Sequence, residues 1–64
     1  MTYEEARKEA DAYTERTDKG AFVYADNAID GGFAWCTEWH YRRGSFQYLT
    51  PEEIVYSSLE GEYA

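Results

Sequence analysis

The chain has very few of several residues on which small proteins often depend. Its 64 residues include one cysteine, one proline, one methionine and one histidine. The single cysteine, Cys36, excludes a disulfide within these residues, and too few Cys and His are present for a typical zinc site. No apolar run approaches the roughly 20 residues that cross a bilayer. The stretch MTYEEARKEA lacks the apolar segment of a signal peptide, so we expect a cytoplasmic protein with no membrane contact.

Basic residues are scarce as well. Six Lys and Arg stand against 13 Asp and Glu, which gives a formal net charge of −7. From residue 20 onward the only bases are Arg42 and Arg43. Two arginines are too few for phosphate binding, so direct binding to nucleic acid is not expected. A chain this acidic repels polyanions and is attracted to basic surfaces.

Aromatic residues, in contrast, are abundant. Seven tyrosines, three phenylalanines and two tryptophans are present, and a buried ring removes about 150–250 Å² from water. We therefore expect the rings to form much of the core of a domain that is too short to bury a large aliphatic one. A patch of exposed rings is the alternative if Trp35 and Trp39 are not both buried.

The sequence predicts one domain over residues 1–64, of class α+β and order α-β-β-β-α. A three-stranded antiparallel sheet would carry two helices on one face or at its ends. Thr2 and Glu5 form a capping box that begins a helix ending near Thr17, and Thr50-Pro51 begins a second helix. The predicted elements are a helix over 2–17, strands over 21–25, 33–41 and 46–49, a loop over 26–32, a turn over 42–45, a helix over 51–60 and a frayed tail over 61–64.

Residue spacing predicts which side chains face inward. On the first helix the inward stripe is Tyr3, Ala6, Ala10, Tyr13 and Thr17, and on the last helix it is Ile54, Val55 and Leu59. The second predicted strand alternates with period two, so its two faces separate. We expect the helices to cover Phe33, Trp35, Thr37, Trp39 and Tyr41, and we expect solvent at Ala34, Cys36, Glu38, His40 and Arg42.

No catalytic, metal or cofactor site is expected. Cys36, Glu38 and His40 share one face of the predicted strand, but residues four apart on a strand are about 13 Å apart, too far for a Cys–His dyad. A fourth metal ligand of the usual type is missing. Gly31-Gly32 lacks the pattern and the lysine of a phosphate-binding loop. An enzyme is therefore not expected.

The remaining hypothesis is charge imitation. Carboxylates four residues apart on a helix differ by about 6 Å in rise, which suits a surface that replaces phosphates on a basic partner. The rings would hold a rigid scaffold, and the acids would contact the partner. The candidate partner-binding residues are Glu4, Asp11, Glu15, Asp18, Asp26, Asp30, Glu38, Glu52, Glu53, Glu60 and Glu62.

In size, acidity and Tyr/Trp content, and in stretches such as FVYADNAIDGGFAW and YLTPEEIVYSSLEGEYA, the chain resembles the small acidic anti-CRISPR proteins of bacteriophages that act as DNA mimics. No signature motif defines that class, so no residue role is carried over. The resemblance implies a protein inhibitor in the host-cell cytoplasm whose partner is a CRISPR surveillance complex of type I. The contact would be a basic surface that binds DNA or reads the PAM.

Two alternatives remain open at this level. The partner could be another basic DNA-acting protein, such as a restriction, repair or toxin enzyme. The chain could also be an accessory protein with an interface formed by Trp35, Trp39 and Tyr41. An edge strand could pair with a second copy, so the sequence leaves monomer and homodimer equally open.

Overall fold

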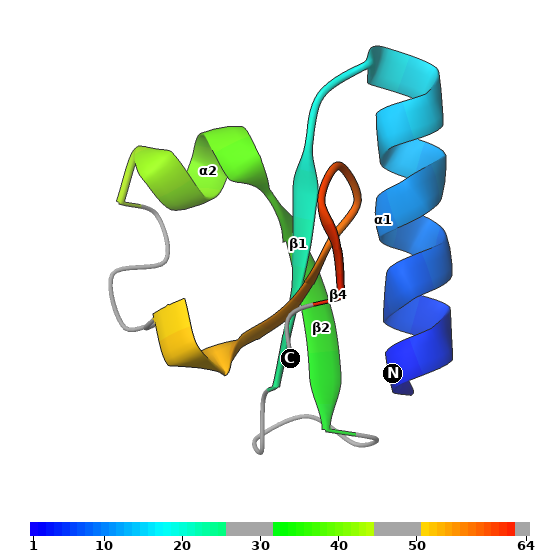
Figure 1. Cartoon of the computed structure of the whole chain (residues 1–64), viewed down its shortest axis with the longest axis vertical. Coiled ribbons are helices and arrows are strands. Elements are labelled where there is room, and N and C mark those ends of the chain that lie inside the picture. Colours follow the sequence, from blue (N-terminus) through cyan, green and yellow to red (C-terminus); the bar gives the residue numbers. More distant parts are fainter. Residues whose placement is uncertain (26–31, 45–50, 63–64) are drawn as a thin grey trace.

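The computed structural model describes residues 1–25, 32–44 and 51–62 (Figure 1). Its elements in chain order are α1 (Tyr3–Thr17), β1 (Ala21–Ala25), β2 (Phe33–Thr37), α2 (Glu38–Arg42), the 3-10 turn η1 (Pro51–Glu53), β3 (Ile54–Ser57) and β4 (Gly61–Glu62). The strands form one antiparallel sheet in the order β2-β1-β3-β4. The expected α+β class is confirmed, whereas the number of strands and the order of elements differ from the prediction.

Helix α1 forms as its sequence predicts. The Thr2 side chain accepts a hydrogen bond from the Glu5 backbone N–H, and the Glu5 side chain accepts one from the Thr2 N–H, so the capping box is present. These hydrogen bonds lower the pKa of Glu5, as expected for a carboxylate that accepts donors at a helix N-terminus. The helix ends at Asp18, which adopts a left-handed conformation with φ of 62°.

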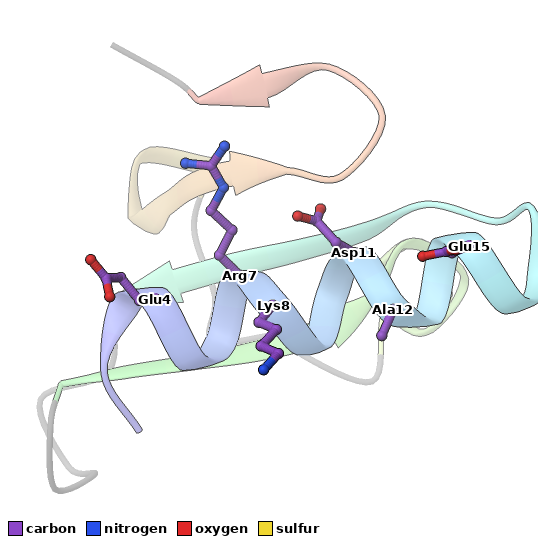
Figure 2. A pocket seen from close by; sticks show the side chains of 6 residues that line it. All are labelled: Glu4, Arg7, Lys8, Asp11, Ala12 and Glu15. Atoms are coloured by element: carbon purple, nitrogen blue, oxygen red, sulfur yellow. The ribbon is translucent and has the colours of Figure 1, made fainter.

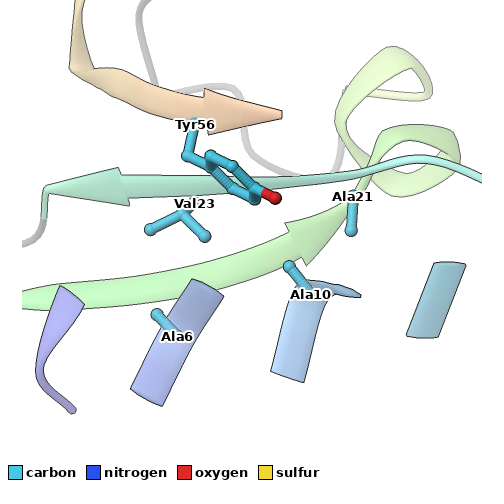
Figure 3. Packing of buried hydrophobic residues seen from close by; sticks show 5 residues of the cluster. All are labelled: Ala6, Ala10, Ala21, Val23 and Tyr56. Carbon is cyan, nitrogen blue, oxygen red and sulfur yellow. The ribbon is translucent and has the colours of Figure 1, made fainter. Parts of the chain in front are cut away.

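The main core lies between α1 and the sheet. Ala6 and Ala10 are fully buried against Ala21 and Val23 of β1 and Tyr56 of β3 (Figure 3). Because alanine side chains are small, the helix backbone approaches the sheet closely. The surrounding partly buried rings are Tyr3, Tyr13, Phe33 and Trp35. The inward stripe predicted for the first helix is therefore confirmed.

The second predicted strand ends earlier than expected. It was predicted to reach Tyr41, but β2 stops at Thr37 and the chain continues as α2. The Thr37 side chain caps this helix by accepting a hydrogen bond from the His40 N–H. Arg42 and Glu38 add an ion pair at 2.8 Å across one helical turn. The N-cap at Thr37 and the i,i+4 pair therefore stabilise a helix where the alternating rings had predicted a strand.

The second face of β2 is also different from the prediction. We expected Cys36 to face solvent, but it is buried with Phe22 and Ile54, and Tyr24 and Tyr41 pack against them. Tyr41 reaches this cluster from α2, and its ring lies edge-on to Phe22 with 5.4 Å between the ring centres. The sheet is therefore covered on both faces, by α1 on one and by α2 on the other (Figure 1).

The C-terminal region was predicted incorrectly. Instead of a helix over 51–60, one turn of 3-10 helix leads into β3, which pairs with β1. Ile54, Val55 and Tyr56 favour a strand because branched and aromatic side chains pack well on a sheet, and β1 offered a free edge. Gly61–Glu62, predicted as a frayed tail, form β4. Leu59, predicted to face inward, is 59% exposed.

Two serines hold the connection between β3 and β4. The buried Ser57 hydroxyl accepts hydrogen bonds from the N–H groups of Leu59 and Glu60. The Ser58 hydroxyl accepts one from the Ala21 N–H and also contacts the Thr14 hydroxyl of α1. The hairpin is thus fixed to both β1 and α1. The predicted strand over 46–49, and the predicted loop and turn except for residues 32 and 42–44, lie outside the described residues.

Candidate acidic interface on helix α1

Three of the predicted carboxylates project from one side of α1. Glu4, Asp11 and Glu15 are exposed, and together with Arg7 and Lys8 they line an open hollow along the helix (Figure 2). Their separations of seven and four residues keep them on one helical face. Asp18 follows at the end of the helix and is also exposed. A row of carboxylates therefore runs from the first turn of the helix to its C-cap residue.

The β3–β4 hairpin adds a fifth carboxylate to this side of the molecule. Glu62 of β4 accepts a hydrogen bond from Arg7 with 2.7 Å between Nη1 and Oε1. The Arg7 guanidinium lies 4.5 Å from the centre of the Tyr56 ring, and the Tyr56 hydroxyl donates a 2.6 Å hydrogen bond to Asp11. We call Glu4, Asp11, Glu15, Asp18 and Glu62 the acidic face.

The network around Tyr56 fixes two members of this face. Burial raises the pKa of Tyr56, and the hydrogen bond to the Asp11 carboxylate raises it further, so the phenol keeps its proton and continues to donate. Hydrogen bonding to Tyr56, with a smaller effect of Glu62, raises the pKa of Arg7. Asp11 and Glu62 therefore serve the fold as well as the surface. Within the described chain, no ion pair engages Glu4, Glu15 or Asp18.

The acidic face is not purely negative. Its five carboxylates are accompanied by Arg7 and Lys8, so its formal charge is −5 + 2 = −3. Arg7 pairs with Glu62 and lies over the Tyr56 ring, whereas Lys8 is exposed beside the row of carboxylates. A partner would therefore meet a mixed surface with an excess of carboxylates and one exposed ammonium group.

The other predicted residues do not join this face. Glu52 and Glu53 are exposed on η1, which lies across the sheet from α1 (Figure 1). Glu38 is on α2, where it pairs with Arg42. Glu60 is in the turn between β3 and β4. Asp26 and Asp30 lie outside the described residues. The structure thus brings together five of the eleven predicted carboxylates.

Sequence reasoning missed the residues that organise the face. Arg7 was not among the predicted site residues, and Tyr56 was placed in the predicted helix over 51–60. The pair of Arg7 and Glu62 spans 55 positions in the chain, so no local pattern could reveal it. Glu9, which was not predicted as a site, accepts a 2.8 Å hydrogen bond from the Trp35 indole on the β2 side of α1.

The fold separates Cys36 and His40, the two side chains that could act as a nucleophile and a base. Cys36 is buried, and burial raises its pKa to about 11, so its thiol is a poor nucleophile near neutral pH. His40 is exposed on α2, and its Nδ1 lies 2.6 Å from the Thr37 hydroxyl. Among residues 1–25, 32–44 and 51–62, no group of three or more His, Cys, Asp or Glu side chains could hold a metal ion.

Comparisons with protein-family models, with curated proteins and with solved structures found no match. The candidate interface therefore rests on the residues themselves. As for membranes, none of the helices in the described part of the chain has the length and apolar character needed to span a bilayer.

Proposed function

We propose that this chain is a non-enzymatic inhibitor that binds a basic, nucleic-acid-binding surface of a partner protein through the acidic face of α1. In the most specific form of this proposal, the partner is a type I CRISPR surveillance complex, and the inhibitor occupies the surface that would bind target DNA. The observation that carries the proposal is the row of exposed carboxylates along α1 (Figure 2). Glu62 of β4 joins this row through its ion pair with Arg7.

The spacing of the row suits a surface that normally contacts phosphates. Asp11 and Glu15 differ by about 6 Å in helical rise, and Glu4 and Asp11 by about 10 Å. Phosphates on one strand of B-DNA advance by about 3.4 Å along the axis. The spacing of Asp11 and Glu15 therefore matches roughly two phosphate steps, and the spacing of Glu4 and Asp11 matches roughly three. Lysines and arginines placed for a DNA backbone could contact them without large rearrangement.

The backbone that carries the acidic face is anchored to the rest of the fold, which favours binding. Side chains and segments that are ordered before association lose less entropy when the complex forms. Here the capping box fixes the start of α1, and buried alanines fix its distance from the sheet. The Arg7–Glu62 pair and the Tyr56–Asp11 hydrogen bond fix the hairpin against the helix. The net charge of −7 would also speed association with a basic partner.

Asp18 is in a place where the fold itself does not favour a carboxylate. It follows the last turn of α1 and has a left-handed backbone conformation. The C-terminal end of a helix carries partial negative charge, so an acid there is unfavourable. Asparagine would tolerate this backbone conformation equally well without the charge. A negative charge that costs some stability is consistent with a role in binding.

The test is inhibition of DNA binding by a purified, guide-loaded type I complex with a fluorescent target duplex. Wild-type protein should displace the duplex, and displacement should weaken steeply between 0.1 and 1 M salt, where the screening length falls from about 10 to about 3 Å. The variant Glu4→Gln/Glu15→Gln removes two charges from the acidic face and should inhibit about tenfold less, at about 0.7 kcal/mol for each contact.

Glu52→Gln/Glu53→Gln is the matched control, because it removes the same charge from the other side of the sheet. It should inhibit as well as the wild type. Equal loss in both variants would show that only net charge matters and would contradict a specific contact through α1. No inhibition by the wild-type protein would rule out the type I complex as its partner.

A further inference from the structure

A second surface, at the end of the molecule where α1 leads into β1, carries exposed apolar side chains. Trp39 of α2 is 53% exposed and Leu59 of the β3–β4 turn is 59% exposed. They line an open hollow of about 300 Å³ together with Lys19, Gly20, Glu38 and Arg42. Because Trp39 and Leu59 share one hollow they form a single apolar patch, and patches of this kind often mark interaction sites. None of these residues belongs to the acidic face.

Gly20 forms the floor of this hollow. Its carbonyl accepts a 2.9 Å hydrogen bond from the Glu38 N–H, which places the start of α2 beside it. A Cβ atom at this position would meet Glu38 Oε2 at 2.5 Å and Leu59 Cδ1 at 2.8 Å. Glu38 and Leu59 therefore pack directly against Gly20, and a side chain at position 20 would displace both of them from their present positions in the hollow.

The rim of the hollow is basic in a chain that is otherwise strongly acidic. Arg42 and Lys19 line it, and the Arg43 guanidinium lies 4.6 Å from the centre of the Trp39 ring. Glu38 is the one acid among the lining residues, and it is paired with Arg42. The lining residues Lys19, Arg42 and Glu38 give a formal charge of +2 − 1 = +1, and Arg43 beside Trp39 adds one more positive charge, against −7 for the whole chain.

We propose that this hollow binds a short acidic peptide segment of a partner protein. An apolar side chain of the segment would lie between Trp39 and Leu59, and its carboxylates would pair with Arg43 and Lys19. Charge complementarity supports this occupant, because a basic rim around an apolar centre fits an aliphatic residue flanked by acids. The proposal uses none of the residues of the acidic face and does not depend on the proposed function.

Single-stranded nucleic acid fits this surface less well. Base stacking needs an open aromatic face, but Arg43 already covers one face of Trp39, and His40 stands at its edge with 4.9 Å between the ring centres. A long polyanion would also be repelled by the rest of the chain. A peptide with a few carboxylates interacts mainly with groups within about 8 Å at physiological salt.

The test is a titration of ¹⁵N-labelled protein, followed by its amide and indole NMR signals. The probe is a nine-residue peptide with one central leucine and two glutamates on each side. We expect shifts at Lys19, Gly20, Leu59 and the Trp39 indole. A peptide with alanine in place of leucine should bind about tenfold more weakly, since three side-chain carbons are lost and the open hollow buries each of them only in part. A peptide with lysines in place of glutamates should not shift these signals.

Variants of the protein give a second measure of the same site. Leu59→Ala should weaken the leucine peptide about tenfold, and Arg43→Glu should weaken it about fivefold or more. Lys8→Glu is the matched control for charge, because Lys8 is an exposed base on α1, and it should bind within about twofold of the wild type. Glu4→Gln/Glu15→Gln should also leave peptide binding intact, so failure of the proposed function would not affect this result.

Several outcomes would overturn the proposal. Equal binding of the leucine and alanine peptides would show that the apolar centre is not used. Tighter binding of oligothymidylate than of the peptide at the same signals would assign the surface to nucleic acid. Shifts of these signals with protein concentration alone would assign it to contact between copies of this chain.

Discussion

The two faces of the sheet are covered very differently. On one side α1 supplies 15 residues, a complete capping box and two fully buried alanines. On the other side α2 supplies five residues, none of which is buried. Figure 1 shows the long helix and the short one on opposite sides of the strands.

The difference shows how a chain of this size divides its residues between stability and surface. A helix of five residues has little intrinsic stability and depends on its contacts with the sheet. It covers Phe22 with Tyr41, but it leaves Trp39 exposed. The α1 side holds most of the core and presents the acids outward, whereas the α2 side closes a smaller cluster and presents an apolar hollow.

The largest effect on this comparison should come from truncating one tyrosine on each face. Tyr56 is 5% exposed in the α1-side core, and Tyr56→Ala should lower the free energy of unfolding by about 3–5 kcal/mol. Tyr41 is only partly buried, so Tyr41→Ala should cost about half as much. Urea denaturation followed by circular dichroism measures both. If Tyr41→Ala were the more damaging, the α2 side would be the main core.

Tyr56→Phe provides a second, milder test of the α1 side. It keeps the ring and removes the hydroxyl that donates to Asp11. We expect a cost of about 1 kcal/mol. The double variant Tyr56→Phe/Asp11→Asn should cost less than the sum of the single changes, because both remove the same contact.

The next largest change in the free energy of unfolding should come from Cys36 at alkaline pH. Burial raises the pKa of this thiol from 9.0 to about 11, so between these values the folded chain keeps a proton that the unfolded chain releases. This thiol does not alter stability below pH 9, and it lowers stability as pH rises through this window, by about 1–2 kcal/mol because solvent screens part of the effect. The measurement is the free energy of unfolding from pH 8 to pH 11. Cys36→Ala should show a shallower decline, and an equal decline would contradict burial of the thiol.

Loss of an N-cap should distinguish the two helices. Thr2→Ala removes the cap of α1 and should cost about 1 kcal/mol of global stability. Thr37→Ala removes the cap of α2, and we expect it to loosen α2 while changing global stability less. Hydrogen exchange resolves the two cases, because Thr37→Ala should speed exchange of the α2 amides alone. Faster exchange throughout the sheet would mean that α2 is needed for the whole fold.

The smallest effect on stability should come from the acidic face. Glu4→Gln/Glu15→Gln should change the free energy of unfolding by less than about 0.5 kcal/mol, because exposed groups outside specific contacts contribute little. Asp18→Asn should raise it by a few tenths of a kcal/mol through the helix dipole. Thermal denaturation of the three proteins measures this. A large loss of stability in either variant would mean that these acids serve the fold and would weaken the case for a binding role.

Local signals in the sequence were sufficient for the first third of the fold. The capping box, the stripe of Ala6 and Ala10 and the strand over 21–25 all occur as predicted. Each of these depends on residues within a few positions of one another. The outward row of Glu4, Asp11, Glu15 and Asp18 follows from the same helical spacing.

The rest of the fold depends on contacts that the sequence does not display locally. Thr50-Pro51-Glu52-Glu53 has the form of a helix start, yet only one turn follows, because Ile54 to Ser57 pair with β1. Trp39 and Tyr41 continue an alternating pattern, yet the cap at Thr37 turns them onto a helix. Glu62 joined the acidic face only because β4 formed and placed it beside Arg7.

The most direct test of the central claim, that the acidic face of α1 is the contact surface, is a pull-down from nuclease-treated bacterial lysate. Wild-type protein, Glu4→Gln/Glu15→Gln and Glu52→Gln/Glu53→Gln would be compared at low and high salt, with bound proteins identified by mass spectrometry. We expect the wild type and the Glu52/Glu53 variant to recover the same nucleic-acid-binding protein at low salt, and the Glu4/Glu15 variant to lose it. Recovery of that partner by the Glu4/Glu15 variant at wild-type levels would contradict the claim.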